Sequence, residues 1–413
     1  MIKLFGYYWV MSIDTNPEKI KELLERGVQE VIDKSHLEKA LQSGKKLRVK
    51  FGIDPTSPDL HLGHFIPLRK LRQFQELGHQ VILLIGDFTA QIGDPTGKSS
   101  ARKTITEKEV KENMKEYTNQ AGKILNLKKI ELRYNSEWYN KKGVDFAIQL
   151  ASKFTFARLI ERDDFQKRIK ADIDVSMNEL IYPLLQGYDS VELKADVEIG
   201  GTDQKFNLLY GRKVQKKYEI PEQDVMTLPL LVGTDGTNKM SKSLGNFIKI
   251  TEEPSKMFGL VMSIPDNLIW NYYHLLTNIP DEQIKKIKEK VRHYGFSPMQ
   301  AKMDLSEEIV KNFYGEKKAQ GAKKEFEKVH QKGELPSEIR EVEFPEIIKL
   351  TEMLHVSGVA DSIGAGRRLI EQGAVEVDNE KITDWTKEIK IKDGMIVKAG
   401  KRSWFKTKLY PPK

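Results

Sequence analysis

The chain has 413 residues, more than one compact core usually holds, which indicates two or three domains. It contains no cysteine, which excludes disulfides, thiolate metal sites and cysteine nucleophiles, and its eight scattered histidines leave almost no ligands for a structural metal. No apolar run approaches the roughly 20 residues that span a bilayer, so we expect a cytoplasmic protein without a membrane partner. The net charge of +8 favours a polyanionic partner.

The first 90 residues follow the pattern of a βαβ unit. The opening stretch lacks the cleavage pattern of a signal peptide, and Met11 is an alternative start. Amphipathic helices are expected from Pro17 to about Leu41, and the alternating run Arg48 to Asp54 predicts a strand. A helix from about His61 to Leu77 and a strand at 81–85 follow. Strands joined in this way form a parallel sheet, so we predict an α/β fold.

The stretch "GDPTGKSS", which begins at Gly93, looks like a phosphate-binding loop but has the wrong spacing. Such a loop needs four residues between its first glycine and the Gly-Lys-Ser, because that length builds the cradle of backbone N–H groups. Only three residues separate Gly93 from Gly97, and one of them is Pro95, which has no N–H. The stretch is therefore not a nucleoside-triphosphate loop of this kind.

The rest of the chain divides into further parts. We predict a Rossmann-like parallel-sheet nucleotide-binding catalytic domain at 1–232, with an N-terminal helical arm and a helical insertion at about 103–180. A lysine-rich loop and a helical domain follow at 233–330. The segment 331–346 has poor periodicity and two prolines, so we interpret it as a linker. The last part, 347–413, is predicted to be a small α/β module.

"HLGH", from His61 to His64, lies at the expected start of the first long helix. The two imidazoles are three positions apart and so share one helical face. The helix N-terminus adds unpaired N–H groups and a partial positive charge, which together favour an anion. Gly63 removes a side chain, so that a nucleotide can approach the backbone. Two histidines at this spacing are also typical of capping residues.

The segment "GTDGTNKMSKSLGN", which begins at Gly233, carries Lys239 and Lys242 between glycines. This pattern is typical of a mobile loop with paired cations, which can close on a polyphosphate whose charge shifts during reaction. A lysine pair in a loop is otherwise ordinary solvated charge. Its occurrence downstream of HLGH in a βαβ chain makes phosphate chemistry the stronger interpretation.

At this point the chain resembles the class I aminoacyl-tRNA synthetases, whose two signatures have the forms HIGH and KMSKS. The resemblance covers nearly the whole chain and is closest to bacterial tyrosyl-tRNA synthetases. "FGIDPTSPDLHLGH", "YPLLQGYDS", "IGGTDQ" and "KMSKS" occur in that family's order and at about its spacing. The combination is highly specific.

The resemblance implies a tyrosine–tRNA ligase that forms tyrosyl adenylate and pyrophosphate from tyrosine and ATP and then transfers tyrosine to the 3′-terminal ribose of tRNA(Tyr). Tyr182, Gln186 and Asp189 lie at i, i+4 and i+7, so one helix would present all three on one face. A solvated polar stripe is the alternative interpretation. In the family, matching residues surround tyrosine, with Tyr182 and Gln186 near the ammonium and Asp189 on the phenol hydroxyl.

The other site residues are also implied by the resemblance. The signatures supply His61, His64, Lys239 and Lys242 for catalysis, joined by Lys98 and Arg102 on a flexible segment that reaches the pyrophosphate. The expected tyrosine-binding set adds Asp94 for the ammonium and Gln204 for the carboxylate. The expected ATP-binding set is Asp54, His61, Gly63, His64, Gly201, Asp203 and Lys242. Mg²⁺ should accompany ATP, and no structural metal is expected.

One departure from the family concerns the phenol. Lys50 and Phe51 stand where the family often has a tyrosine and a cysteine that contact the phenol and the ribose. Strand alternation puts Lys50 on the same face as Gly52 and Asp54, towards the site. The phenol is therefore expected to be held differently in this chain.

The C-terminal module carries features of RNA binding. A short helix with Arg367 and Arg368 precedes a hairpin with an Asp-Asn turn, and the tail contains Lys401, Arg402 and the pair Trp404-Phe405. Basic residues interleaved with aromatic ones suit a phosphate backbone and unstacked bases. The pattern is similar to a small RNA-binding module of one ribosomal protein and of pseudouridine synthases. A basic tail that only aids solubility is the alternative.

Other functions remain open at this point. A nucleotidylyltransferase for small molecules would also bind phosphates at an HLGH helix start, but it would need neither the C-terminal module nor the Tyr182–Gln186–Asp189 stripe. A non-catalytic RNA-binding protein on a synthetase scaffold would be expected to have lost catalytic residues, whereas both signatures are intact. The tryptophanyl enzyme is the nearest competitor on substrate. The resemblance also implies a homodimer.

Overall fold

The computed structural model describes residues 13–96, 105–293, 295–332, 334–335, 337, 339–400 and 403–410. The chain forms two compact units, residues 1–323 and 324–413. In the described part of the chain, no helix combines the length and the apolar character that a membrane crossing requires.

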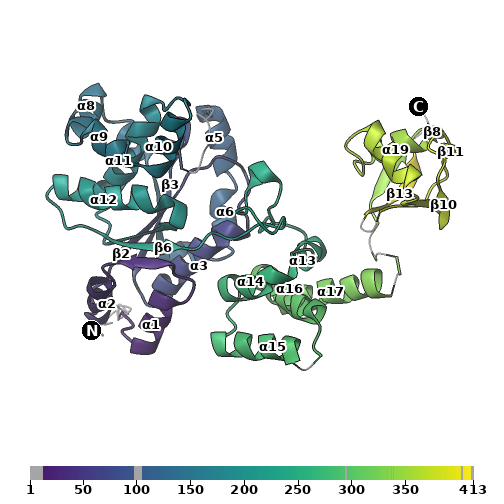
Figure 1. Cartoon of the computed structure of the whole chain (residues 1–413), viewed down its shortest axis with the longest axis horizontal. Coiled ribbons are helices and arrows are strands. Elements are labelled where there is room, and N and C mark those ends of the chain that lie inside the picture. The colour runs from purple at the N-terminus through teal and green to yellow at the C-terminus, as the bar shows by residue number, and fades with distance from the viewer. Residues whose placement is uncertain are drawn as a thin grey trace, which may run out of the picture. The chain divides into compact units, whose positions relative to one another are not determined.

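The first unit is built on a six-stranded sheet (Figure 1). Its strands are β1 (Glu30–Ile32), β2 (Arg48–Ile53), β3 (Gln80–Ile85), β4 (Ile130–Tyr134), β5 (Val197–Gly201) and β6 (Asp224–Leu228). Their order is β1-β6-β5-β2-β3-β4; all neighbours run parallel except β1, which is antiparallel to β6. The predicted α/β fold with a parallel sheet is confirmed.

The strand order reverses between β2 and β5, since β3 and β4 continue on one side of β2 and β5 and β6 on the other. In open α/β sheets, such a switch point leaves a crevice outside the carboxyl ends of the strands, where ligands bind. Here β2 and β5 pair only at Val49–Val197 and Lys50–Glu198, although both strands continue beyond these residues. The two strands therefore open a gap at their carboxyl ends.

Helices cover both faces of the sheet (Figure 1). On one face, Ile82 and Leu84 of β3 share a core with α11 (Met177–Glu192) and α12 (Lys205–Lys217). Strand alternation turns the neighbouring β3 side chains to the other face, which is the side of α3 (Leu62–Glu76). The remaining helices of the first unit are α1 (Pro17–Glu25), α2 (Lys34–Gln42), α4 (Thr89–Ile92), α5 (Glu107–Met114), α6 (Tyr117–Ala121), α7 (Ser136–Tyr139), α8 (Val144–Ser152), α9 (Phe156–Leu159), α10 (Asp163–Lys170), α13 (Pro254–Met262), α14 (Ile269–Leu276), α15 (Asp281–His293), α16 (Pro298–Tyr314) and α17 (Glu316–Phe326), which ends in the second unit.

Three strands of this sheet were missed from the sequence. β1 lies inside the stretch expected to be helical up to Leu41, β4 lies inside the expected helical insertion, and β6 follows α12. β4 reads "IELRY", with charged residues at alternate positions, and its residues are half-buried because the strand lies at the edge of the sheet. β1 has only three residues, too few for periodicity to show.

The second unit has its own core and two sheets. The larger sheet has the order β10-β9-β12-β13-β7, and the smaller pairs β11 with β8. Its elements are β7 (Glu341–Phe344), β8 (Ile347–Lys349), α18 (Leu350–Val356), α19 (Ile363–Glu371), β9 (Val375–Val377), β10 (Glu380–Ile382), β11 (Glu388–Lys390), β12 (Ile396–Ala399) and β13 (Ser403–Leu409). β7 pairs with β13 and lies within the segment that we interpreted as a linker.

The predicted hairpin with an Asp-Asn turn is confirmed. β9 and β10 are antiparallel neighbours, and Asp378 and Asn379 between them have φ angles of 48° and 67°. Two consecutive residues with positive φ make the turn type whose twist matches that of the flanking strands.

The close approach of α11 and α12 in the first unit gives a test of this packing. A Cβ added at Gly187 would lie 2.5 Å from Val214 Cγ2 and 3.3 Å from Gly211 Cα. Replacing Gly187 with alanine should therefore overpack the contact and lower the free energy of unfolding by about 1–3 kcal/mol, measured by urea denaturation. Gly259→Ala in α13 is the matched control: a Cβ there meets open space, and the change should be neutral or stabilising by about 0.4–1 kcal/mol. Equal stability of the two variants would contradict the close packing.

Candidate active site

A pocket of about 350 Å³ lies where β2 and β5 diverge. Its wall includes residues from the carboxyl ends of β2, β3 and β5, from the start of α3 and from α11. Twelve of the site residues expected from the sequence line it together: Asp54, His61, Gly63, His64, Asp94, Tyr182, Gln186, Asp189, Gly201, Asp203, Gln204 and Lys239. Lys98, Arg102, Lys401 and Arg402 lie outside the described residues.

The two histidines of HLGH cap the N-terminus of α3. His61 is the N-cap, and its Nδ1 accepts a hydrogen bond from the Gly63 N–H at 3.1 Å; His64 Nδ1 in turn accepts one from the His61 N–H at 3.2 Å. A Cβ at Gly63 would lie within 3.0 Å of the His61 ring, so glycine is required by this cap. Because each Nδ1 is an acceptor, a neutral ring carries its proton on Nε2 and has a donor left for a ligand.

Both imidazoles are neutral at physiological pH. Burial lowers the pKa of His61 to about 2, and the neighbouring His64 and Lys242 add to the effect. Burial, followed by the charge of Lys242, lowers the pKa of His64 to about 4. These side chains therefore act as neutral hydrogen-bond donors and do not supply a formal charge.

The loop that carries the two signature lysines is folded around Asn246. Its Oδ1 accepts from the Ser241 N–H at 2.8 Å, and its Nδ2 donates to Lys239 O at 3.1 Å and to Asp235 Oδ2 at 3.0 Å. The loop turns at Gly236 and Gly245, which have positive φ. Asn246 was not singled out from the sequence.

Carboxylates hold both signature lysines. Lys239 Nζ lies 2.9 Å from Asp203 Oδ2, and Lys242 Nζ lies 3.0 Å from Asp59 Oδ2. Lys242 begins the short helix η3 (Lys242–Leu244) and is not part of the pocket wall. Lys249 also reaches Asp59, at 3.1 Å. Burial acts to raise the pKa of Asp59, but the hydrogen bonds from Lys242 and Lys249 leave it below its usual value.

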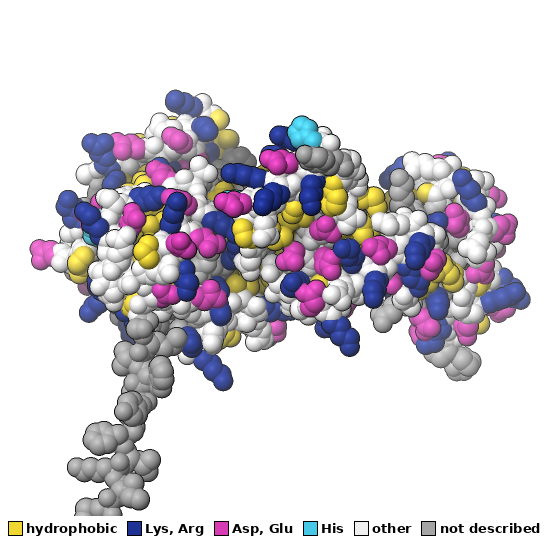
Figure 2. All heavy atoms as spheres, turned by 90° about the horizontal axis from the view of Figure 1, so that it is seen from below, with side chains coloured by type: hydrophobic (Ala, Val, Ile, Leu, Met, Phe, Trp, Pro, Cys, Tyr) yellow, Lys and Arg dark blue, Asp and Glu magenta, His cyan; other side chains and the backbone are white. Residues whose placement is uncertain are grey.

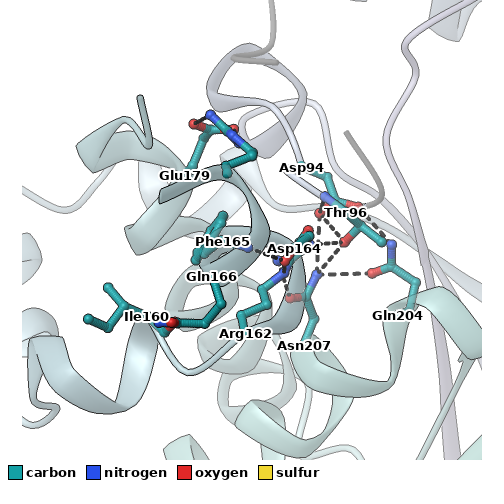
Figure 3. A network of polar contacts seen from close by, with 11 residues as sticks. Asp94, Thr96, Ile160, Arg162, Asp164, Phe165, Gln166, Glu179, Gln204 and Asn207 are labelled. Carbon is teal, nitrogen blue, oxygen red and sulfur yellow. Dashed lines mark hydrogen bonds and ion pairs between the residues drawn. The ribbon is translucent and has the colours of Figure 1, made fainter. Parts of the chain in front are cut away.

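Asp94 lies in a network of polar contacts (Figure 3). Its Oδ2 accepts from Gln204 Nε2 at 2.7 Å, and its Oδ1 accepts from the Thr96 hydroxyl at 2.6 Å. Behind Thr96 lies the buried guanidinium of Arg162, which donates to Thr96 Oγ1 at 2.9 Å and to Asn207 Oδ1 at 3.2 Å. Arg162 and Asn207 were missed because they belong to no motif, and tertiary folding alone brings them to Asp94.

α11 presents Tyr182, Gln186 and Asp189 to the pocket, as the spacing predicted. The intervening Leu184 and Leu185 are buried in the core. The Tyr182 hydroxyl donates to Asp54 Oδ2 at 2.9 Å, and Thr89 Oγ1 donates to Asp54 Oδ1 at 2.8 Å. Burial, with the negative charges of Asp54 and Asp94, raises the pKa of Tyr182 well above its usual value, so its hydroxyl remains a donor.

Asp189 is buried at the inner end of this row and is held by two side chains that the sequence did not reveal. Trp138 Nε1 donates to its Oδ1 at 3.1 Å, and Asn135 Nδ2 donates to its Oδ2 at 3.3 Å. Asn135 directly follows β4. Polar residues at the carboxyl ends of parallel strands are expected near a site, so recognition of β4 as a strand would have pointed to it.

Among the described residues, no group of three or more His, Asp or Glu side chains is placed to hold a metal ion.

In the second unit, Arg367 and Arg368 lie exposed on α19. The Arg367 guanidinium lies 4.2 Å from the centre of the Trp385 ring and forms an ion pair with Glu371. Phe405 is fully buried in the core of the unit, which corrects the expectation that it stacks on bases; its neighbour Trp404 is half-buried.

Comparison with known proteins identifies the family. The family model for class I tRNA synthetases (W and Y) matches residues 42–331. A tyrosine–tRNA ligase of Dehalococcoides mccartyi is 48% identical over 95% of this chain and 100% of its own length. One of Thermotoga maritima is 46% identical over 94% of this chain and 97% of its own. The chain belongs to the tyrosine–tRNA ligase family.

The tyrosine–tRNA ligase family is a family of class I ligases, so the resemblance inferred from the motifs is confirmed. Solved structures share the fold. A truncated mitochondrial tyrosyl-tRNA synthetase of Aspergillus nidulans has a TM-score of 0.64 at 24% identity, covering 74% of this chain and 92% of its own. The tyrosyl-tRNA synthetase of Archaeoglobus fulgidus complexed with L-tyrosine has a TM-score of 0.59 at 21% identity, covering 74% and 99%.

The network behind Asp94 gives a prediction about stability. Arg162 is buried and donates to Asp164 at 2.7 and 2.8 Å. Replacing Arg162 with methionine should lower the free energy of unfolding by about 2–3 kcal/mol; a fully buried pair would cost more, but Asp164 keeps some contact with water. Arg158→Met is the control, because its ion pair with Glu161 is exposed and should contribute less than about 1 kcal/mol. Chemical denaturation measures both, and similar small losses would show that the network contributes little.

Proposed function

We propose that this chain is a tyrosine–tRNA ligase. It activates L-tyrosine with ATP to tyrosyl adenylate and pyrophosphate, and transfers tyrosine to the 3′-terminal ribose of tRNA(Tyr). The observation that carries the proposal is one pocket, lined both by the capped N-terminus of α3 and by the row Tyr182, Gln186 and Asp189. Membership of the family supports it.

The proposed tyrosine site follows the polarity of the pocket. Asp94, Tyr182 and Gln186 would surround the ammonium, and Gln204 would contact the carboxylate. Asp189 would accept the phenol hydrogen bond at the inner end. A buried acceptor there disfavours phenylalanine, which would leave the acceptor unpaired. Tyrosyl-tRNA synthetase is the reference example of this effect, with a discrimination of tyrosine from phenylalanine of about 10⁵.

The proposed activation step needs no general base, because the tyrosine carboxylate is already ionised at neutral pH. The carboxylate oxygen attacks the α-phosphorus of ATP, and pyrophosphate leaves with the electron pair of the broken P–O bond. The barrier is alignment and charge repulsion. His61 and His64 can donate from Nε2 to phosphate oxygens beside the positive end of the α3 dipole.

ATP itself would lie between β2, β5 and the lysine loop. Asp54 and Gly63 would contact the nucleotide, and Gly201 and Asp203 the ribose. As the loop closes, Lys239 would leave Asp203 and Lys242 would leave Asp59, and both lysines would then bind phosphate oxygens. Lys98 and Arg102 would reach the pyrophosphate. Mg²⁺ would arrive with ATP as part of the substrate, held mostly by the phosphates, where it neutralises charge.

The second unit would contact the tRNA through Arg367, Arg368, Lys401 and Arg402. On the face drawn in Figure 2, side chains of both charges are intermixed, so the net charge of +8 is not gathered there into one basic patch. The exposed arginines on α19 can contact phosphates, and such contacts fix the position of a protein on a nucleic acid. We also propose that the reaction takes place in the cytoplasm, which the likeness to bacterial tyrosine–tRNA ligases favours.

A homodimer forms part of the proposal. The helical insertion exposes large apolar side chains, with Val144 76%, Ile148 61% and Phe156 61% accessible. A second copy of the chain is the partner that the family resemblance favours for this surface. Analytical ultracentrifugation should show a dimer that Ile148→Asp weakens; a monomeric parent chain would reject this part.

The decisive experiment for the function is ATP–pyrophosphate exchange with each of the twenty amino acids. Tyrosine should drive exchange, with phenylalanine and tryptophan weaker by orders of magnitude. Exchange driven best by tryptophan would show that the substrate is tryptophan, as in the tryptophanyl enzyme. Exchange with none of the twenty would overturn the proposed activity.

The lysine loop should act on the transition state more than on tyrosine binding. Lys242→Ala should slow adenylate formation by roughly 10²-fold or more and leave the tyrosine KM within a few-fold, because its charge is needed as pyrophosphate departs. Lys239→Ala should act in the same direction. Single-turnover kinetics measure the step. Lys249→Ala is a matched control that removes the other lysine from Asp59 and should leave the rate nearly unchanged. An unchanged chemical step in Lys242→Ala would reject the role.

Truncation should separate the two half-reactions. A chain without residues 339–413 lacks both sheets of the second unit but keeps the whole pocket. It should keep tyrosine-dependent exchange and lose transfer to tRNA, with weaker tRNA binding and a shallower salt dependence, since each lost phosphate contact removes roughly one released counterion. Filter binding at several salt concentrations measures this. Normal charging by the truncated chain would show that the second unit is not the tRNA anchor.

A further inference from the structure

The pocket wall contains a fully buried lysine to which the proposed reaction assigns no role. Lys50 of β2 is 0% exposed. Its ammonium binds Gln186 O at 3.0 Å, Ser190 Oγ at 2.8 Å and Glu198 Oε1 at 3.0 Å. An ammonium has three donors, so these three acceptors use all of them. Lys50 therefore has no proton left with which to contact the phenol directly.

The partner of Lys50 is fixed by the sheet. Lys50 and Glu198 are opposite each other in the last paired position of β2 and β5, directly below the gap between the strands. Both line the pocket, and Glu198 is only 1% exposed. The ion pair thus forms part of the pocket floor. A buried ion pair often contributes no more stability than packed apolar residues would, so stability alone does not account for it.

Glu198 also determines the orientation of the Gln186 side-chain amide. Its Oε1 accepts from Gln186 Nε2 at 3.1 Å, and its Oε2 accepts from Ser190 Oγ at 3.2 Å and from Gln223 Nε2. A carboxylate only accepts, so the Gln186 amide must direct its NH₂ group towards it. The amide oxygen then points away from Glu198 and is left as an acceptor. A substrate ammonium, which only donates, needs this orientation.

Lys50 also influences Asp189, three residues along α11 from Gln186. Burial raises the pKa of Asp189 to about 7, and the positive charge of Lys50 opposes the rise. The other groups around this carboxylate are Trp138 and Tyr139 on α7, Asn135 after β4, and Tyr182 on α11 itself. The ionised form accepts the phenol hydrogen bond.

We propose that Lys50 and Glu198 are positioning residues for the amino-acid substrate. Glu198 orients the Gln186 amide for the ammonium, and Lys50 neutralises Glu198, anchors α11 and keeps Asp189 an acceptor for the phenol. The inference rests on the proposed function and deepens it. Lys50, which stands where the family often has a tyrosine, thus acts through α11 and does not contact the phenol.

The test is the pH dependence of the tyrosine KM in ATP–pyrophosphate exchange. In Lys50→Met the opposing charge is lost, so the neutral form of Asp189 persists to higher pH. The midpoint above which tyrosine binds well should move up by roughly one to three pH units, and the KM at pH 7.5 should rise at least about tenfold. The preference for tyrosine over phenylalanine should fall, because a protonated Asp189 no longer demands a donor.

Two variants separate charge from packing. Ser190→Ala removes one contact of Lys50 but keeps its charge, so the midpoint should stay at the parent value. Lys50→Met combined with Glu198→Gln removes both charges at nearly constant volume, and therefore remains informative if Lys50→Met alone does not fold. The double variant should fold and show a higher tyrosine KM because Gln186 can now turn either way; its midpoint should rise less than that of Lys50→Met, because the two removed charges act on Asp189 in opposite senses.

The outcomes are distinct. If the parent chain shows no tyrosine-dependent exchange, the proposed function fails. If the parent shows exchange and a folded Lys50→Met keeps the parent midpoint and the parent preference for tyrosine, or a folded double variant keeps the parent tyrosine KM, this inference alone is overturned. A raised midpoint in Ser190→Ala would also overturn it, because packing and not charge would then control Asp189.

Discussion

The candidate active-site pocket depends on one constraint, the short pairing between β2 and β5. The two strands share only two paired positions before they diverge, and they do so where the strand order of the sheet reverses. Helices that follow the two strands must leave towards different sides of the crevice, so α3 starts at one wall of the pocket and the helix after β5 at another. The backbone thereby provides an anion-binding helix end and an open cavity before any catalytic side chain is considered.

The polar groups of the pocket depend on this opening. A buried charge is costly unless it has a hydrogen-bond or ion-pair partner, and the charged groups of the pocket have such partners. Asp54 is held by Tyr182 and Thr89, and Asp189 by Trp138 and Asn135. The lysine loop likewise rests on Asp203 and Asp59. A site with these acceptors and with neutral histidine donors suits a reaction limited by alignment and charge, in which no proton needs to be removed from the nucleophile.

Sequence reasoning succeeded where a pattern was long or a motif specific. The spacing of Tyr182, Gln186 and Asp189 placed them on one helical face, and the run before Asp54 was recognised as the strand that leads to HLGH. It failed for the strands β1, β4 and β6. Because β4 was not recognised, Asn135 and Trp138, which follow it and donate hydrogen bonds to Asp189, went unnoticed. Phe405 was misjudged because an aromatic residue in a basic tail has the same local pattern whether it is buried or exposed.

The sequence by itself determined the family, the α/β class and the chemistry of the motifs, because these depend on residue type and on spacing along the chain. Only the tertiary structure decided which side chains meet across long separations. Lys50 and Glu198 are far apart in the sequence, and strand alternation could say only that Lys50 faces the site. That its charge is fully paired, with contacts to Gln186, Ser190 and Glu198, follows from the register of β2 against β5 and from burial, which no local pattern encodes.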